Sequence, residues 1–316
     1  MDDTRPPSSA LKLPNPQVHL GTDQEGRVMK VIVLLSGGID SCVVLAHALS
    51  QGHSCTALSF HYGQRHVCEL ESAAKIAAYY GVDHRTIRID PSLFSGPASS
   101  SLTNPHLTVD TEQNAHHPNT YVPCRNLLFL SHAASLAEAQ GVGAIYFGAN
   151  ANDGPSYPDC RPAFFQAFET AVEHGSYVGH NGLNLETAVG PRQKVQDFES
   201  ESLTLGVEHS QKVKATPIVS DYGSKDCAFC EESTAVSRLK IVCPLIDLDK
   251  ASIVALGRKL NAPLDLTWSC YDPHHEKPCT VCTACTLRTS ALSIKTPHKE
   301  DFAKLAIAIC EVQSEG

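Results

Sequence analysis

The stretch from Lys30 to Leu45, KVIVLLSGGIDSCVVL, predicts a buried strand, a tight turn and a helix in direct succession. The apolar, largely β-branched run that ends at Leu35 is typical of a strand in a parallel sheet covered on both faces. Gly37 and Gly38 let the backbone turn sharply and approach a ligand closely. The amide groups at the start of the following helix, together with the flanking serine hydroxyls, are therefore expected to bind phosphate.

The residues that follow alternate between strand and helix patterns. Such alternation predicts βαβ units and an α/β fold with a doubly wound, mostly parallel sheet. Asp249 is expected to cap the last helix of this series. We expect strands at 55–60, 84–89 and 144–149, an ordered apolar stretch at 241–246, and helices at 42–50, 66–80, 126–140, 162–174 and 250–260.

Composition suggests where the ordered domain begins and ends. Residues 1–28 contain four prolines and no periodicity, which is typical of a flexible tail. The α/β domain is expected at 29–264, with a long loop at 90–119 and a polar, glycine-rich insertion at about 175–237. Residues 265–316 are expected to form a small metal-binding region and a C-terminal helix.

The overall charge and the termini limit the class of protein. A formal charge of -9 in 316 residues argues against a protein whose whole surface binds nucleic acid. The N-terminus lacks the apolar run of a signal peptide, and no stretch approaches the roughly 18 consecutive apolar residues of a membrane span. Thirteen cysteines in such a chain indicate free or metal-bound thiols in a reducing compartment. We therefore expect a cytoplasmic protein without a membrane or nucleic-acid partner.

The turn after the first strand, SGGIDS, differs from two common nucleotide-binding motifs. It has neither the lysine of a P-loop nor the spacing of a dinucleotide fingerprint. It resembles the pyrophosphate loop of the N-type ATP pyrophosphatases, whose fold is adenine-nucleotide α-hydrolase-like. The resemblance implies that ATP, with Mg²⁺, is cleaved between its α- and β-phosphates. The implied ATP-binding residues are Leu35, Ser36, Gly37, Gly38, Ile39, Asp40, Ser41, Cys42, Val43, Val44 and Leu45.

Asp40 is unexpected in a loop that binds anions. It either helps to hold a divalent metal or fixes the loop through internal hydrogen bonds.

Four cysteines near the C-terminus have metal-ligand spacing: Cys270, Cys279, Cys282 and Cys285. C-x-x-C pairs bring two thiolates to one ion, and four thiolates fill the tetrahedral shell of a structural Zn²⁺. An iron–sulfur cluster takes the same ligands, and His274 or His275 could replace one cysteine. Zinc, one ion per chain, is the favoured interpretation.

Further segments, in order along the chain, resemble the 7-cyano-7-deazaguanine synthases, which make the nitrile precursor of queuosine. They are FHYGQRH at 60–66, NTYVPCRN at 119–126, SYPDCR at 156–161, PLID at 244–247 and TWSCY at 267–271. The resemblance implies a ligase that joins 7-carboxy-7-deazaguanine and ammonia at the expense of ATP. An acyl adenylate and an amide are the implied intermediates.

Candidate residues for this reaction lie in the matching segments. Arg125 and Arg161 are predicted to neutralise phosphate or carboxylate, since a guanidinium group binds such anions bidentately. Asp159 is predicted to accept hydrogen bonds from the guanine-like edge of the substrate. Tyr157 or Phe60 is predicted to stack on a purine ring, although aromatic residues are more often part of a core.

Some features depart from the family pattern. Cys124 stands where relatives carry a small residue, Ser156 replaces a glycine, and the tail and the insertion are long. Cys227 and Cys230 within the insertion are interpreted as surface thiols.

Other functions remain open at this stage. The first alternative is a tRNA-modifying thiolase of the same fold, and the second is a zinc-ribbon binding module without catalysis. The family resemblance also implies a homodimer.

Overall fold

The computed structural model describes residues 29–65, 68–109, 118–177, 238–273 and 277–293. The predicted tail at 1–28 and nearly all of the predicted insertion lie outside these ranges. The same is true of Cys227, Cys230, His274, His275 and the last part of the C-terminal region, 294–316.

The described residues form one parallel sheet with the strand order β3-β2-β1-β4-β5. β1 lies at its centre, where Val31 pairs with Cys55 on one side and with Ala144 on the other. The strands are β1 (Lys30–Leu34), β2 (Ser54–His61), β3 (Asp83–Arg88), β4 (Ala144–Tyr146) and β5 (Lys240–Val242).

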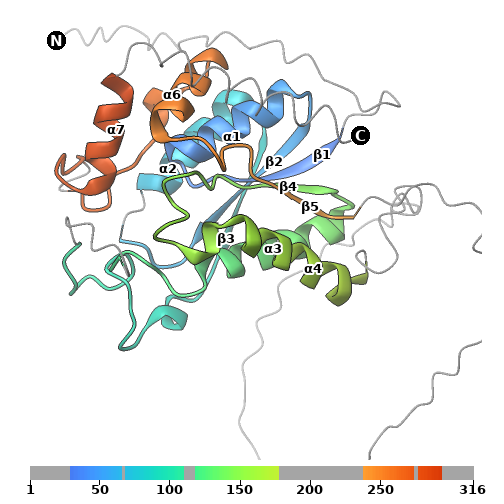
Figure 1. Ribbon diagram of the computed structural model, residues 1–316, viewed down its shortest axis with the longest axis horizontal. Coiled ribbons are helices and arrows are strands. Elements are labelled where there is room, and N and C mark those ends of the chain that lie inside the picture. Colours follow the sequence, from blue (N-terminus) through green and yellow to red (C-terminus); the bar gives the residue numbers. More distant parts are fainter. Residues whose placement is uncertain (1–28, 66–67, 110–117, 178–237, 274–276, 294–316) are drawn as a thin grey trace, which may run out of the picture.

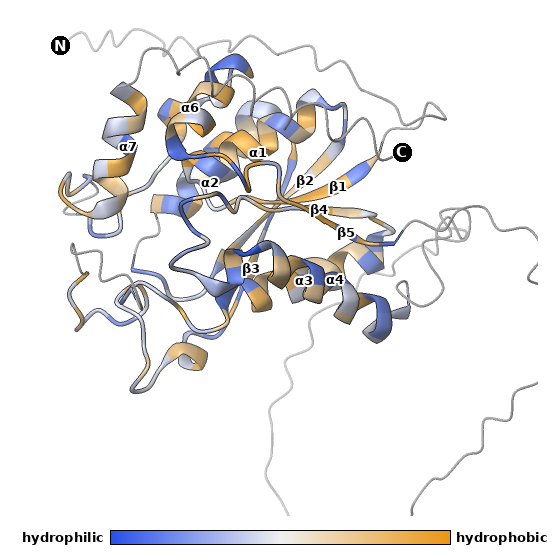
Figure 2. Ribbon diagram, in the orientation of Figure 1, coloured by the Kyte–Doolittle hydropathy of each residue, from blue (hydrophilic) through white to orange (hydrophobic). Residues whose placement is uncertain are grey.

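Helices cover both faces of the sheet, as the predicted doubly wound fold requires (Figure 1). Val31 and Val33 of β1 face the first layer, whereas Ile32 and Leu34 face the second. Figure 2 shows the resulting apolar centre, with polar residues toward the outer sides of the helices. The first layer contains α1 (Ile39–Ser50), α2 (Cys68–Tyr80), α6 (Lys250–Lys259) and α7 (Thr283–Ser293), and the second contains α3 (Arg125–Gln140) and α4 (Pro162–Gly175).

The predicted strands and helices are confirmed, with changes at their ends. β4 ends at Tyr146 rather than Ala149, and the chain beyond it lines the cavity described below. β5 ends at Val242, shortly before Pro244, which has no amide hydrogen to donate to a sheet. The Asp249 side chain caps α6, as predicted, by accepting a hydrogen bond from the Ser252 amide at 2.8 Å.

The strand order positions the functional site. β1 connects through α1 to β2, whereas the chain crosses from β3 to β4 on the other side of β1. Ligands of open α/β sheets bind at the carboxyl ends of the strands where the order reverses in this way. The turn after β1 lies at that place. None of the helices among the described residues is long and apolar enough to cross a membrane.

Gly257 of α6 packs closely against α1. An added Cβ would lie 2.8 Å from Cγ2 of Val43 and 3.1 Å from Cδ2 of Leu264. We predict that Gly257→Ala lowers the free energy of unfolding by about 1–3 kcal/mol, although alanine ordinarily stabilises a helix. Chemical denaturation measures the change.

Gly175 provides the matched control, since nothing lies within 4 Å of a Cβ added there at the end of α4. Gly175→Ala should leave stability unchanged or raise it. Val43→Ala, introduced into the Gly257→Ala variant, should recover part of the loss. If Gly257→Ala and Gly175→Ala changed the free energy of unfolding equally, the described packing of α6 on α1 would be wrong.

Candidate active site and metal centre

The turn after β1 brings its backbone against α2. Gly37 has φ +90°, and an added Cβ would collide with the backbone carbonyl oxygen of Glu69 and lie 2.9 Å from the Ala73 nitrogen. Only glycine fits both the conformation and the space. On its other side, the Gly37 carbonyl oxygen accepts a hydrogen bond from the Trp268 amide at 2.8 Å.

Serine hydroxyls and helix amides make this turn suitable for binding phosphate. The oxygens of Ser36 and Ser41 lie 3.1 Å apart, and Ser41 Oγ donates to the Gly38 carbonyl oxygen at 3.1 Å. The first helical hydrogen bond of α1 runs from the Cys42 amide to Gly38 O, so the three preceding amides lie outside the helical pattern. The start of α1 therefore offers donors and the positive end of a helix dipole.

The predicted ATP-binding stretch divides into two parts. Leu35, Ser36, Gly38, Asp40 and Ser41 line a cavity, whereas Cys42, Val43, Val44 and Leu45 are fully buried in the core. The second part supports the loop from within α1.

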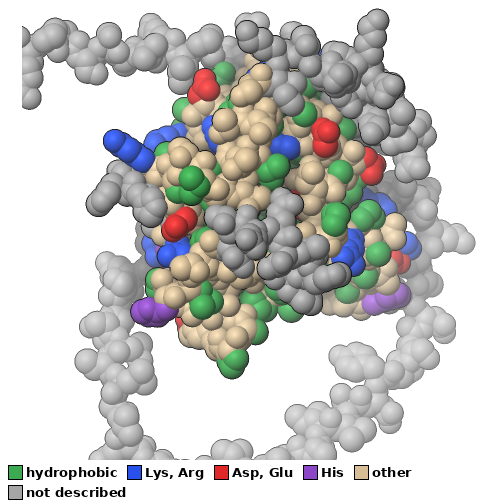
Figure 3. Space-filling model, turned by 60° about the vertical axis from the view of Figure 1, so that its left-hand side comes forward, with side chains coloured by type: hydrophobic (Ala, Val, Ile, Leu, Met, Phe, Trp, Pro, Cys, Tyr) green, Lys and Arg blue, Asp and Glu red, His purple; other side chains and the backbone are tan. Residues whose placement is uncertain are grey.

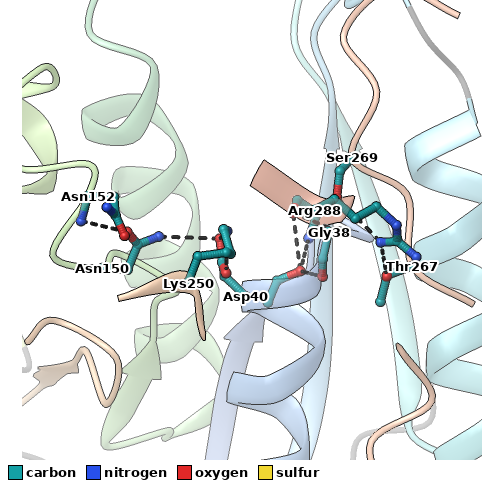
Figure 4. A network of polar contacts seen from close by, with 10 residues as sticks. Gly38, Asp40, Asn150, Asn152, Lys250, Thr267, Ser269 and Arg288 are labelled. Carbon is teal, nitrogen blue, oxygen red and sulfur yellow. Dashed lines mark hydrogen bonds and ion pairs between the residues drawn. The ribbon is translucent and has the colours of Figure 1, made fainter. Parts of the chain in front are cut away.

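Asp40 is held by side chains from two other elements (Figure 4). Its two carboxylate oxygens accept hydrogen bonds from Nζ of Lys250 at 2.7 and 2.6 Å. Nδ2 of Asn150 donates to the same carboxylate at 3.3 Å. Asp40 was expected either to hold a divalent metal or to fix the loop through internal hydrogen bonds. These contacts support the second explanation, but the partners lie outside the loop, in α6 and in the segment after β4.

A cavity of about 260 Å³ opens beside the loop at the carboxyl ends of the strands. The FHYGQRH segment contributes Phe60, Tyr62, Gln64 and Arg65 to its wall. The opposite elements contribute Thr120, Arg125, Asn126, Asp153, Tyr157 and Tyr271, among others. Four of the segments that carried the family resemblance therefore meet the turn at Ser36–Ser41, called the phosphate loop below, around one space.

Arg125 presents its guanidinium group to this cavity from the start of α3. Its Nη1 donates to the Tyr62 hydroxyl at 3.3 Å, and its Cζ lies 5.9 Å from the centre of the Tyr62 ring. Burial disfavours the charge, but Tyr62, Tyr271 and Asp159 together raise the pKa of Arg125. The group stays cationic and suits an anion.

Cys124, at the boundary between loop and helix, has φ 53° and ψ 22°. Glycine adopts this left-handed conformation more readily than a cysteine does. The cysteine adopts it without displacing Arg125 from the cavity.

The other predicted substrate residues differ in how they relate to the cavity. Tyr157 lines it, and its hydroxyl lies 2.7 Å from Thr120 Oγ1. Phe60 also lines it but already stacks on Phe129, with ring centres 4.1 Å apart. Asp159 is buried behind the wall, where its Oδ2 accepts from the Asn126 amide at 3.3 Å.

Arg161 is exposed, and it donates to the carbonyl oxygens of Gly154 at 2.8 Å and Pro155 at 3.4 Å. The structure thus brings Tyr157 and Arg125 to the cavity directly and does not place Asp159 or Arg161 in its lining. The substrate-binding roles of the latter two remain predictions.

Sequence reasoning missed two acidic residues that line the cavity, Glu69 and Asp153. Burial raises the pKa of Glu69 to about 7, and Arg125 opposes the rise. Burial and the charge of Asp40 raise the pKa of Asp153 to about 6. Glu69 follows the FHYGQRH segment by three residues, and Asp153 follows a predicted strand. Both positions, close to a matching segment or to the end of a strand, indicate that the residue lies near the cavity. An acidic residue in the sequence, however, is as compatible with the protein surface as with a cavity wall.

The four predicted cysteines come together as one cluster. Their sulfur atoms all lie within 4.8 Å of one another, and those of Cys279 and Cys285 are 4.0 Å apart. A Zn–S bond of about 2.3 Å in a tetrahedron places sulfurs about 3.8 Å apart, so the cluster fits a metal with little adjustment. The amides of Cys279 and Cys282 donate to sulfurs of the cluster at 3.1 and 3.3 Å. The group can hold a metal ion and is compatible with zinc.

This cysteine cluster is connected to the phosphate loop. Arg288 of α7 donates to Thr267 Oγ1 (Figure 4). It also donates to the Leu264 carbonyl oxygen at 3.1 Å. The residue after Thr267 is Trp268, whose amide binds Gly37. Ala291 of α7 is buried in the core of the first layer. The metal-binding region therefore packs directly behind the loop.

Comparison with known proteins decides the family. A model of the family described as queuosine biosynthesis protein QueC matches residues 30–233 and 221–296. The chain belongs to the QueC family. The 7-cyano-7-deazaguanine synthase of Leptospira interrogans (strain Fiocruz L1-130) is 38% identical over 261 residues, which is 82% of this chain and 84% of that protein. The 7-cyano-7-deazaguanine synthase of Thermoplasma volcanium is 36% identical over 260 residues, with the same coverage.

The solved structures that resemble this chain do so only weakly. The U34-tRNA thiolase NcsA from Methanococcus maripaludis, solved with its [4Fe-4S] cluster, matches 94% of this chain and 76% of that one at 13% identity and a TM-score of 0.37. A match at this level supports neither a thiolase activity nor an iron–sulfur cluster. On the face drawn in Figure 3, the described basic and acidic side chains are interspersed and form no continuous basic patch.

The close approach of Gly37 to α2 gives a first prediction for the QueC-family site. Gly37→Ala should lower the free energy of unfolding by at least about 2 kcal/mol, because it adds a strained φ and a collision with backbone. Gly38 has φ -78° and only ordinary contacts for a Cβ, at 3.4 Å and beyond. Gly38→Ala should therefore cost less than about 1 kcal/mol. Equal losses in thermal denaturation would contradict the described loop.

The cysteine cluster gives a second prediction. Cys282→Ser should remove the bound metal, measured by elemental analysis of the purified protein, because the closed site loses one of its four ligands. Cys124→Ser is the matched control, since Cys124 is a free cysteine outside the cluster. Metal retained at the original stoichiometry in Cys282→Ser would show that the site is built differently.

Proposed function

We propose that the chain converts 7-carboxy-7-deazaguanine and ammonia into 7-cyano-7-deazaguanine, with ATP as the source of activation. One observation supports this most directly: the phosphate loop and the cationic Arg125 line the same cavity. In this mechanism the substrate carboxylate attacks the α-phosphate of ATP, and ammonia then displaces AMP to give an amide. A second activation, of the amide oxygen, allows loss of AMP and formation of the nitrile.

The two activations follow from elementary chemistry. A carboxylate or amide oxygen is a poor leaving group, whereas AMP is a good one. The protein must hold two anions together and orient them, which contributes several kcal/mol to catalysis. A loop rich in donors next to a buried guanidinium group meets this requirement.

We assign roles to the residues that line the cavity. The amides and hydroxyls of Ser36–Ser41 hold the departing pyrophosphate, accompanied by Mg²⁺. Arg125 neutralises the substrate carboxylate or the α-phosphate. Tyr157 contacts the purine-like ring. Asp159 and Arg161 are kept as candidate substrate residues. They would act after a local rearrangement, since Arg161 now holds the carbonyl oxygens of residues 154 and 155.

We also propose that the four cysteines hold one structural Zn²⁺, which would leave no open position for catalysis. The ion would stabilise the segment that carries Trp268 and thereby the phosphate loop. A domain division at residues 264 and 265, a homodimer and a cytoplasmic location complete the proposal. Light scattering of the purified protein tests the dimer.

Product analysis by mass spectrometry tests the proposed reaction. Purified, zinc-loaded protein is incubated with 7-carboxy-7-deazaguanine, ammonium and Mg-ATP. We predict 7-cyano-7-deazaguanine and AMP, and Arg125→Ala should lower the rate by at least about 100-fold. Formation of ADP instead of AMP would contradict attack at the α-phosphate. If folded, metal-loaded protein formed neither product, the proposed substrate would be wrong.

A further inference from the structure

Glu69 is a carboxyl group in the cavity to which the proposed function has given no task. It lies in the first turn of α2, and its own backbone carbonyl oxygen is the atom that packs against Gly37. Among the described residues, no hydrogen bond or ion pair to the Glu69 carboxylate is formed. Within the described part of the chain, this carboxylate is therefore not committed to a hydrogen bond or ion pair, and it lies in the same cavity wall as the phosphate loop.

The surroundings of Glu69 make proton transfer feasible near neutral pH. Burial raises its pKa to about 7, and Arg125 acts in the opposite direction. A carboxyl group with a pKa near neutral pH is partly ionised there, and its carboxylate form is basic enough to accept a proton. The other ionisable groups that line the cavity come from every element around it: Asp40 in α1, Tyr62 and Arg65 after β2, Arg125 at the start of α3, Asp153, Tyr157 and Cys160 after β4, and Tyr271, which follows Cys270 of the cysteine cluster.

Asp153, the other carboxyl group with a raised pKa, is less suited to this task. Burial raises its pKa, Asp40 raises it further, and Lys250 opposes the rise. The ionisation of Asp153 is therefore tied to the Asp40–Lys250 pair that fixes the loop. Arg125, by contrast, is the charge that acts on the pKa of Glu69.

We propose that Glu69 is the base that removes protons from the nitrogen atom destined for the nitrile. This rests on the proposed function. In the first half, the ammonia lone pair forms a bond to the acyl carbon, the bond from that carbon to the AMP oxygen breaks, and AMP leaves. The nitrogen must then lose one proton to become the amide, and the Glu69 carboxylate accepts it.

The same group serves the second half of the reaction. After the amide oxygen has been adenylated, the nitrogen loses its first proton to give a neutral imidate. The carboxylate takes the remaining N–H proton, whose electron pair becomes the third carbon–nitrogen bond. The carbon–oxygen electron pair leaves with AMP. No oxidant or further reactant is needed, and Glu69 returns its proton to solvent between the steps.

The test starts from the amide, 7-amido-7-deazaguanine, so that the ionisation of ammonia does not affect the pH dependence. Nitrile formation from the amide and Mg-ATP is compared for the wild type and Glu69→Gln. The exchange of labelled pyrophosphate into ATP, driven by 7-carboxy-7-deazaguanine without ammonia, reports carboxylate adenylation separately. We expect Glu69→Gln to lower kcat for the nitrile by at least about 100-fold and to leave the exchange unchanged.

The pH profile distinguishes a base from a structural residue. Because the base must be deprotonated, wild-type kcat/KM for the amide should rise with pH up to about 7 and then level off, following the pKa of Glu69. The residual activity of Glu69→Gln should lack this inflection. Glu71→Gln is the matched control, since Glu71 lies two residues further on the same helix and pairs with Lys75 on the surface.

Each outcome decides the matter. Wild-type-like nitrile formation by Glu69→Gln would overturn the role of Glu69 and leave the proposed function intact. Loss of both the exchange and the nitrile in a variant with wild-type thermal stability would assign Glu69 to binding rather than proton transfer. A wild-type protein that forms no nitrile from either substrate would overturn the proposed function, and this inference with it.

Discussion

The close approach of Gly37 to the backbone of α2 is the constraint on which the rest of the site depends. It fixes the turn between β1 and α1 so that the first amides of α1 face a cavity at the carboxyl ends of the strands. The same contact brings α2, and with it Glu69, to the edge of that cavity. One residue without a side chain thus sets the distance between the first amides of α1 and the carboxyl group of Glu69.

Two supports from the C-terminal part of the chain hold this turn in place. Nζ of Lys250, at the start of α6, donates to both carboxylate oxygens of Asp40. Trp268, held through Thr267 and Arg288, binds the carbonyl oxygen of Gly37. Because the cysteine cluster immediately follows Trp268, a metal bound there would order the segment that supports the loop. Under the proposed function, a metal in the cluster would support nucleotide binding from outside the cavity.

The sequence predicted the fold and the cysteine cluster, since both follow from local patterns. The run KVIVLLSGGIDS specifies strand, turn and helix by itself, and the cysteine spacing specifies the cluster. The partners of Asp40 could not be predicted, because Lys250 lies 210 residues away and only the sheet topology brings it near. Arg161 could not be placed either: its motif marks the cavity, yet its side chain holds nearby carbonyl oxygens. Glu69 became visible only when burial and the neighbouring Arg125 were known.

The central claim is that the loop and Arg125 direct a substrate oxygen to the α-phosphate of ATP. The most direct measurement follows ¹⁸O from doubly labelled 7-carboxy-7-deazaguanine into the nucleotide products by mass spectrometry. The proposed reaction gives AMP that carries one ¹⁸O atom, with two such AMP molecules for each nitrile formed. Label found in water, in ADP or in inorganic phosphate, with unlabelled AMP, would contradict it.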